Sequence, residues 1–308
     1  MIYHGNGAHC FANSFYMGLR SSGQTDIPEV PFLEFLTTMP FGAFYVRPAH
    51  LFFPSGPGIE PDAGINLALQ TMGWTCENYH GGSEAEALAQ LRTALSSGPV
   101  MVGPVDMGYL TYAPGHEHQG GLDHYIIVLE ADETQVRVND PAGWPWARLP
   151  ISDFMTAWRA EAVDYGQRPY RMRWNFRREQ PVSRAEMIAR TLVAVRQRLA
   201  AEWSHPDLAQ GADAICTLAH DLRETVPDPI AGRLIWFALP LAADRLNNAA
   251  AYLREGDAIP AADIALAAAR LYGETLTAAI QHDWTTAAAL LERIAPLEHD
   301  LEQALRAG

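Results

Sequence analysis

The stretch Gly7-Ala8-His9-Cys10-Phe11-Ala12-Asn13-Ser14 places a cysteine where a helix is predicted to begin. Phe11, Phe15 and Leu19 follow at helical spacing, and Gly23 offers a stop. Unpaired backbone N–H groups and the positive end of the helix dipole meet in the first turn of such a helix, where they favour a thiolate over a thiol. The alternative is a small buried apolar cysteine, the commoner state of a lone free cysteine.

Length and cysteine content limit the class of protein. The 308 residues can bury a full core and predict about two domains. The longest apolar stretch, 234–243, falls short of the roughly 20 residues that a membrane span needs, and no secretory signal is visible. Three cysteines without close spacing fit a reducing compartment, so we expect a cytoplasmic protein.

The charge of the chain excludes several chemistries. All 22 basic residues are arginine, so no lysine can form a Schiff base with pyridoxal phosphate or hold a nucleotide in a phosphate loop. The net charge of −14 disfavours nucleic acid as a partner and weakly favours cationic small molecules.

The first 178 residues mix predicted helices and strands with many glycine- and proline-rich loops. Ser83 and Glu86 form a capping box at the start of a helix that should end at Gly98. Apolar or alternating runs predict strands at 100–102, 125–129, 135–139 and 170–176. We therefore predict an α+β domain over residues 1–178.

The composition of the chain changes after Pro181, where alanine becomes frequent and strand patterns disappear. Helical patterns, with a kink or break near Pro240, cover 183–203, 207–223, 229–254, 260–282 and 285–306. We predict an all-α domain over residues 179–308, which could also carry a homo-oligomer contact.

His124 and Asp140 are brought together by the predicted hairpin. His124 directly precedes the run 125–129, and Asp140 ends the run 135–139. Pairing of these runs puts the start of the first strand near the end of the second. A cysteine nucleophile needs a base, and the base needs an orienting partner. Cys10, His124 and Asp140 lie on their elements in the papain-type order, whereas the alternative is a surface histidine and a capping aspartate.

Acyl chemistry also needs donors for the oxyanion. The backbone N–H of Cys10 is one candidate. Papain-like enzymes carry a second donor, usually glutamine, six residues before the cysteine, and this position is His4 here. Asn6 is a further candidate.

Four short motifs resemble the butirosin biosynthesis protein H family. They are His9-Cys10, Asp106-Met107-Gly108-Tyr109-Leu110-Thr111-Tyr112, Gly121-Leu122-Asp123-His124-Tyr125-Ile126-Ile127-Val128 and Val138-Asn139-Asp140-Pro141. The resemblance implies a papain-like fold with a helical C-terminal domain. It also implies transfer of an acyl group from an acyl carrier protein to an amine, in that type case an aminoglycoside.

By motif position, the resemblance makes Cys10 the acyl acceptor, His124 the base and Asp140 the residue that orients it. It implies no cofactor held by the enzyme, because the phosphopantetheine belongs to the donor carrier protein. Asp123 stands where the family usually has glycine before its histidine, which changes the access or the pKa of His124.

Further polar residues near these motifs are candidates for binding the acyl group or the amine. Asp106 could bind an ammonium group or cap its loop. His116 and His118 could be imagined as metal ligands, but a flexible glycine-rich loop gives poor metal geometry, and we expect no metal. The substrate-binding candidates are His9, Asp106, Tyr109, His116, His118 and Asp123.

The basic run from Arg168 to Arg178 is the one positive stretch of an acidic chain. Such runs are usually solvated faces, but an acidic carrier protein would also need a basic surface. The docking candidates are Arg171, Arg173, Arg177 and Arg178. Cys76 and Cys216 are predicted to lie in the core.

We therefore expect a cysteine-dependent acyltransferase of antibiotic-type metabolism that uses an acyl carrier protein and an amine acceptor. One alternative is a peptidase or amidase, in which the same three residues activate water. Another is a binding protein that keeps the fold without catalysis, and the presence of Cys10, His124 and Asp140 together argues against it.

Overall fold

The computed structural model describes residues 2–5, 9–56, 58, 60–163, 168–201, 205–224, 226 and 228–307. The chain forms two compact units, each built from two separate segments. We name the unit of residues 1–30 and 73–181 the sheet unit, and the unit of residues 31–72 and 182–308 the helical unit. The predicted α+β class is confirmed, with a β-sheet in the N-terminal half and helices in the C-terminal half.

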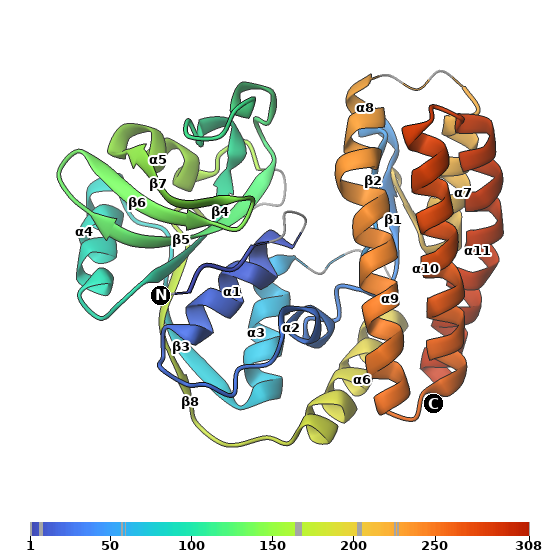
Figure 1. Cartoon of the computed structure of the whole chain (residues 1–308), viewed down its shortest axis with the longest axis horizontal. Helices are drawn as coiled ribbons and strands as arrows, with labels where there is room; N and C mark the ends of the chain where they lie inside the picture. Colours follow the sequence, from blue (N-terminus) through green and yellow to red (C-terminus); the bar gives the residue numbers. More distant parts are fainter. Residues whose placement is uncertain are drawn as a thin grey trace. The chain divides into compact units, whose positions relative to one another are not determined.

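The sheet unit is organised around a six-stranded antiparallel sheet in the order β3-β8-β4-β5-β6-β7 (Figure 1). The strands are β3 (Trp74–Tyr79), β4 (Val100–Asp106), β5 (Asp123–Ala131), β6 (Gln135–Asp140), β7 (Trp144–Pro150) and β8 (Met172–Arg178). The predicted hairpin of β5 and β6 is present, with Ile127 opposite Asn139. The predicted strands at 100–102 and 170–176 correspond to β4 and β8.

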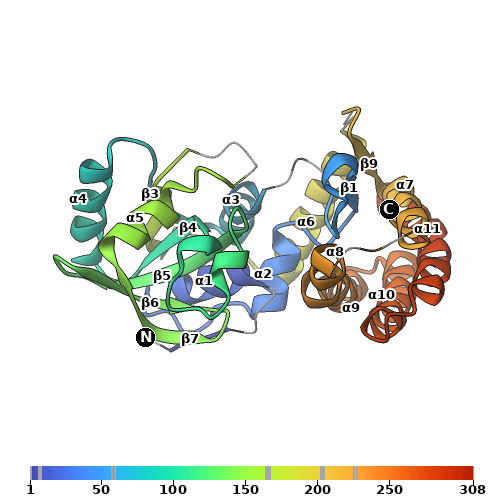
Figure 2. The same cartoon turned by 90° about the horizontal axis from the view of Figure 1, so that it is seen from above.

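Helices cover both faces of this sheet (Figure 2). Side chains alternate between the two faces of a strand. Ile126 and Val128 therefore join the core beneath α4 (Glu84–Leu95) and α5 (Ile151–Arg159), whereas Tyr125 contacts Phe11 of α1. The capping box predicted at Ser83 starts α4.

Helix α1 (Cys10–Arg20) begins at the predicted residue. Phe11, Phe15 and Leu19 are buried, as their helical spacing predicts. Phe15 also contacts Phe176 of β8, with ring centroids 5.9 Å apart. Burying this apolar face holds the first turn of α1 against the sheet.

The helical unit joins long helices to a small sheet. Helices α9, α10 and α11 lie side by side (Figure 1), and α7 packs against α11. Its elements are α2 (Val30–Leu36), β1 (Phe44–Val46), η1 (Arg47–Ala49), β2 (Leu51–Phe53), α3 (Pro61–Met72), α6 (Arg184–Ala200), β9 (Leu208–Gln210), α7 (Gly211–Leu222), α8 (Asp228–Arg233), η4 (Leu234–Ala238), α9 (Leu239–Glu255), α10 (Ile259–Ile280) and α11 (Trp284–Ala307).

Two local expectations for this unit need correction. Strand β9 lies in the half where no strands were expected, because it completes the three-stranded sheet β2-β1-β9. The helix does not break at Pro240; instead, the π-helical segment η4 runs directly into α9, in which Pro240 is the second residue.

The division into units also differs from the single boundary expected after residue 178. Residues 31–72 pack with the C-terminal helices, because β1 pairs with β9 and buried charges join the two segments. Arg245 contacts Glu34 at 2.6 Å with both side chains buried, and Arg198 donates to the backbone carbonyls of Thr38 and Phe41.

Among the residues that the structure describes, none of the helices combines the length and the apolar character that a membrane crossing requires. Cys216 is exposed on α7, contrary to the prediction of a core position, and Cys76 is half-buried on β3.

Candidate active site

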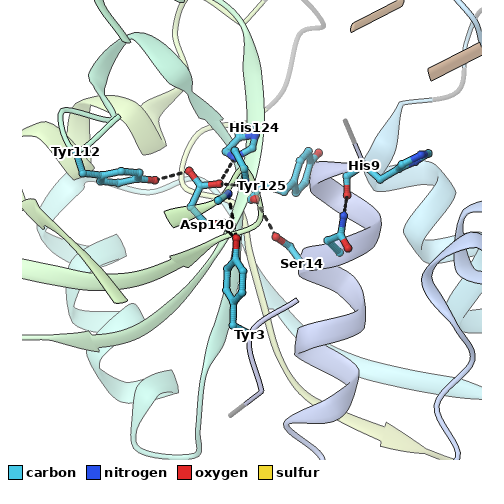
Figure 3. Close-up of polar contacts among 10 residues, drawn as sticks. Tyr3, His9, Ser14, Tyr112, His124, Tyr125 and Asp140 are labelled. Atoms are coloured by element: carbon cyan, nitrogen blue, oxygen red, sulfur yellow. Dashed lines mark hydrogen bonds and ion pairs between the residues drawn. The ribbon is translucent and has the colours of Figure 1, made fainter. Parts of the chain in front are cut away.

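His124 and Asp140 meet at one end of the sheet, as the hairpin predicts. Nε2 of His124 lies 2.6 Å from Oδ1 of Asp140, and both side chains are almost fully buried (Figure 3). The two residues come from neighbouring strands, β5 and β6. A histidine held in this way has a fixed ring orientation, because the carboxylate binds one of its two nitrogens.

The electrostatics of the pair favour an imidazolium beside a carboxylate. Burial lowers the pKa of His124, but the charge and hydrogen bond of Asp140 and those of Cys10 raise it well above its ordinary value. Burial raises the pKa of Asp140, but the charge and hydrogen bond of His124 and the donors Ala142 and Tyr112 bring it below its ordinary value.

Cys10 completes the constellation from the first turn of α1. It is half-buried, follows the N-cap residue His9, and makes a side-chain hydrogen bond with His124. Because Nε2 of His124 faces Asp140, Nδ1 is the nitrogen left for the thiol. The structure thus brings together the three residues that the sequence assigns to catalysis.

Two buried side chains on α1 fix the position of Cys10. The Ser14 hydroxyl donates to the backbone carbonyl of Tyr125 at 2.8 Å, and the Asn13 amide donates to the backbone carbonyl of His9 at 2.8 Å (Figure 3). Ser14 lies one helical turn after Cys10, and Tyr125 follows His124 on β5. This contact therefore ties the helix that carries Cys10 to the strand that carries His124.

Asp140 has further partners that the sequence did not reveal. Oδ2 accepts from the Tyr112 hydroxyl at 2.8 Å, and Oδ1 also accepts from the backbone N–H of Ala142 at 2.7 Å. The Tyr3 hydroxyl donates to the backbone carbonyl of Asp140 at 2.8 Å and accepts from the N–H of Gly143 at 3.0 Å. Tyr112 belongs to a motif noted in the sequence, but only the folded loop shows what it binds.

Among the substrate-binding candidates, Asp106 has a clear structural role. Its buried Oδ1 accepts from the backbone N–H groups of Gly108 and Gly121, so it caps the loop between β4 and β5. Asp123 lies opposite Asp106 in the β4–β5 register. Of the two interpretations of Asp106, the structure shows the cap.

The other candidates on this loop differ in exposure. Tyr109 and His118 are exposed, whereas His116 is partly buried and its Nδ1 lies 2.7 Å from the carbonyl of Gly108. Over the described residues, no three His, Cys, Asp or Glu side chains form a group that could hold a metal ion. His9 is buried at the N-terminus of α1.

Of the two side-chain oxyanion candidates, the structure describes only His4. His4 is exposed, its ring packs on Tyr16 with centroids 4.9 Å apart, and its N–H approaches the sulfur of Met17 at 3.4 Å. Asn6 lies outside the residues that the structure describes. The backbone N–H of Cys10 stays a candidate donor.

The arginine run, a candidate for docking, is not uniformly exposed. Arg173 is buried, Arg171 is partly buried, and Arg178 pairs with Asp26 at 2.8 Å, whereas Arg177 is exposed. Only part of the run could therefore contact a partner.

Comparison with known proteins gives similarity along nearly the whole chain. Residues 205–306 match the family model described as the YobF C-terminal domain. The chain is 29% identical over 304 residues to a Bacillus subtilis (strain 168) protein named "Uncharacterized protein YobF". This similarity covers 97% of this chain and 96% of that protein, so it includes both the sheet unit and the helical unit.

Proposed function

We propose that this protein is a cysteine-dependent acyltransferase that moves an acyl group from an acyl-carrier-protein thioester to an amine of a small molecule in antibiotic-type metabolism. The observation that carries the proposal is the 2.6 Å contact between His124 and Asp140, together with the hydrogen bond between His124 and Cys10. This is the arrangement that nucleophilic acyl chemistry requires.

In the first step, the Cys10 thiolate attacks the thioester carbonyl and forms a tetrahedral intermediate. The carbon–sulfur bond to the phosphopantetheine arm then breaks, and the departing sulfur takes the proton of the His124 imidazolium. The acyl group is now bound to Cys10 as a thioester, and His124 is neutral. The phosphopantetheine leaves with its carrier protein, so the enzyme needs no cofactor of its own.

In the second step, the acceptor amine attacks the acyl-enzyme carbonyl. Neutral His124 accepts a proton from the amine as the new amide forms, and the Cys10 thiolate leaves. The imidazolium–thiolate state is restored. Asp140 stays ionised throughout, because it orients the ring and stabilises the imidazolium rather than reacting.

The competing reaction is hydrolysis, in which water replaces the amine. The same three residues serve both reactions, so the choice depends on whether an amine reaches the acyl-enzyme before water does. The resemblance to the butirosin biosynthesis protein H family supports transfer. The support for a carrier protein as donor also comes from that resemblance. The exposures of the arginine run give little support for a docking surface.

Intact mass spectrometry tests the proposal. The protein is mixed with acyl-pantetheine and acyl-carrier-protein thioesters, and wild type should gain the mass of one acyl group. Cys10→Ala should gain none, whereas the control variant Cys216→Ala should behave as wild type. Addition of an amine should then release the acyl group as an amide.

Two results would overturn the proposal. Cleavage of a peptide or amide without acylation by any thioester would assign the site to a hydrolase. A protein that binds the amine but neither acylates Cys10 nor cleaves an amide would be a binding protein on this fold.

A further inference from the structure

The two carboxylate oxygens of Asp140 have different partners. Oδ1 accepts from Nε2 of His124 at 2.6 Å and from the N–H of Ala142 at 2.7 Å, whereas Oδ2 accepts from the Tyr112 hydroxyl at 2.8 Å (Figure 3). Tyr112 thus holds the oxygen that His124 does not use. The carboxylate cannot turn about its last side-chain bond without breaking this contact.

Tyr112 lies on a loop whose two ends are held together by hydrogen bonds to one residue. The loop connects β4 to β5, and Asp106 at the end of β4 accepts from the N–H of Gly108 at 2.8 Å and from the N–H of Gly121 at 3.0 Å. One buried carboxylate oxygen therefore closes the loop at both ends, within three residues of His124.

The middle of the same loop is anchored as well. Leu110 is fully buried in the core beneath α5, and the Thr111 hydroxyl donates to Asp153 of α5 at 3.0 Å. Tyr109 is 45% exposed. Leu110 and Thr111, which lie between the exposed Tyr109 and Tyr112, are thus held in place. The Tyr112 hydroxyl therefore reaches Asp140 in a defined position.

Burial keeps the Tyr112 hydroxyl protonated and therefore able to donate. Burial and the charge of Asp140 raise the pKa of Tyr112 well above its ordinary value. The titratable groups that face Asp140 are His124 on β5, Tyr112 on the loop, Tyr3 on the N-terminal segment and, beyond His124, Cys10 on α1.

We propose that Tyr112 is a positioning residue of this active site: its hydroxyl holds Oδ2 of Asp140 so that Oδ1 stays aligned on His124, and it thereby links the β4–β5 loop to the catalytic residues. The inference rests on the proposed function in so far as it assigns Tyr112 to the same Cys10–His124–Asp140 site. It requires only that Cys10 be the activated nucleophile, whichever acyl group it carries.

Tyr3 supplies a matched control. Its hydroxyl is as close to Asp140 as that of Tyr112, but the hydrogen bonds that it makes with described residues go to backbone atoms, namely the carbonyl of Asp140 and the N–H of Gly143. Removing either hydroxyl takes hydrogen bonds from the same turn, but of the two hydroxyls it is that of Tyr112 that hydrogen-bonds the carboxylate.

The experiment measures the rate at which iodoacetamide alkylates Cys10 in the full-length protein, from mildly acidic to mildly alkaline pH, for wild type, Tyr112→Phe and Tyr3→Phe. Loss of the Tyr112 donor raises the pKa of Asp140, so Asp140 becomes protonated earlier as the pH falls and His124 loses its anionic partner. Tyr112→Phe should therefore move the acidic limb of the profile to higher pH, with alkylation about tenfold slower on that limb.

Tyr3→Phe should unfold more easily but keep the acidic limb where wild type has it. Equal displacement of the limb in both variants would make the Tyr112 contact merely structural, and a Tyr112→Phe profile that superimposes on wild type would overturn the proposal. If Tyr112→Phe does not fold, 3-fluorotyrosine at position 112 keeps the shape with a stronger donor and should move the limb to lower pH.

A spectroscopic measurement separates alignment from stability. The proton shared by His124 and Asp140 should give a far-downfield proton resonance in wild type and in Tyr3→Phe, and the resonance should shift or broaden in Tyr112→Phe. Because alkylation and this resonance need no acyl donor, the proposal for Tyr112 can fail while acyl transfer stands. A failure to detect acyl transfer would likewise leave these two measurements informative.

Discussion

The Ser14 hydroxyl donates to the backbone carbonyl of Tyr125 at 2.8 Å, and this buried contact joins the helix of Cys10 to the strand of His124. Ser14 and Tyr125 are 111 positions apart in the sequence. The thiol of Cys10 and the imidazole of His124 therefore also come from distant parts of the chain. Their alignment depends on how α1 sits on the sheet.

Ser14→Ala should therefore lower both stability and reactivity. Loss of one intramolecular hydrogen bond should cost about 1 kcal/mol of unfolding free energy in urea titrations. A small displacement of Cys10 from His124 should also slow acylation roughly tenfold. Ser21→Ala is the control, because its hydroxyl bonds the carbonyl of Gly18 at the other end of α1. Equal loss of acylation in both variants would show that Ser14 has no special part in alignment.

Cys10 should be the fastest thiol to react with an alkylating probe at mildly acidic pH. Burial raises the pKa of Cys76, and burial together with the charges of Asp213 and Glu292 raises the pKa of Cys216. Both should stay thiols, and thiols are poor nucleophiles. Peptide mapping should show Cys10 labelled about ten times faster than Cys216, although Cys216 is exposed. Equal labelling of the three would argue against a catalytic Cys10.

The parts of the fold that the sequence predicted are those with a local pattern. Helix α1 follows from the spacing of Phe11, Phe15 and Leu19, and the β5–β6 hairpin follows from two apolar runs with a polar turn between them. His124 lies on the first strand of this hairpin and Asp140 ends the second, so pairing of the strands brings the two residues together. The contact between His124 and Asp140 was therefore predictable, because the two residues are 16 positions apart on paired strands.

What the sequence missed depends on contacts between distant segments. The place of residues 31–72 in the helical unit rests on pairing of β1 with β9 and on the contact of Glu34 with Arg245, 211 positions apart. No local periodicity encodes such contacts. The role of Tyr112 was missed for the same reason, since a tyrosine in a loop gives no sign of which carboxylate it binds until the loop has folded.

Asp140→Asn should reduce turnover strongly without abolishing acylation of Cys10. The asparagine cannot stabilise an imidazolium, so we expect a loss on the order of 10⁴-fold in turnover, with acyl-enzyme still detectable by mass. The charge of Asp140 raises the pKa of His124. In the variant this pKa falls, and the basic limb of the activity profile should move to lower pH. Complete loss of acylation in a folded variant would give Asp140 a different role.

The buried pair of Glu34 and Arg245 should be essential to the helical unit. Arg245→Met leaves the Glu34 carboxylate buried without its cation, which should cost about 3–5 kcal/mol of unfolding free energy. The double variant Glu34→Leu with Arg245→Met should recover much of this loss. The control is Arg223→Met, which breaks the exposed pair with Glu292 and should change stability by less than about 1 kcal/mol. A small effect of Arg245→Met would contradict the assignment of residues 31–72 to this unit.

Glu298 of α11 should give the helical unit a stability that depends on pH. Its side chain is 3% exposed, and its Oε1 has no hydrogen-bond partner within the described part of the chain. Burial raises its pKa to about 7 and the charge of Glu302 acts in the same direction, whereas Arg198 opposes them. Between pH 4.5 and about 7, the Glu298 carboxyl therefore keeps a proton in the folded protein that it has released in the unfolded chain, where its pKa is 4.5.

The sign follows from this difference in bound protons. Stability from protonated Glu298 is fully present below the unfolded pKa of 4.5 and is lost as the pH rises through about 7. Glu298→Gln keeps a neutral side chain at every pH, so urea titrations should show wild type losing roughly 3 kcal/mol more than the variant over this range. Glu302→Gln, one turn further along α11, is the control and should retain most of the wild-type dependence. If Glu298→Gln and wild type lose stability in parallel, the Glu298 carboxyl does not hold the proton.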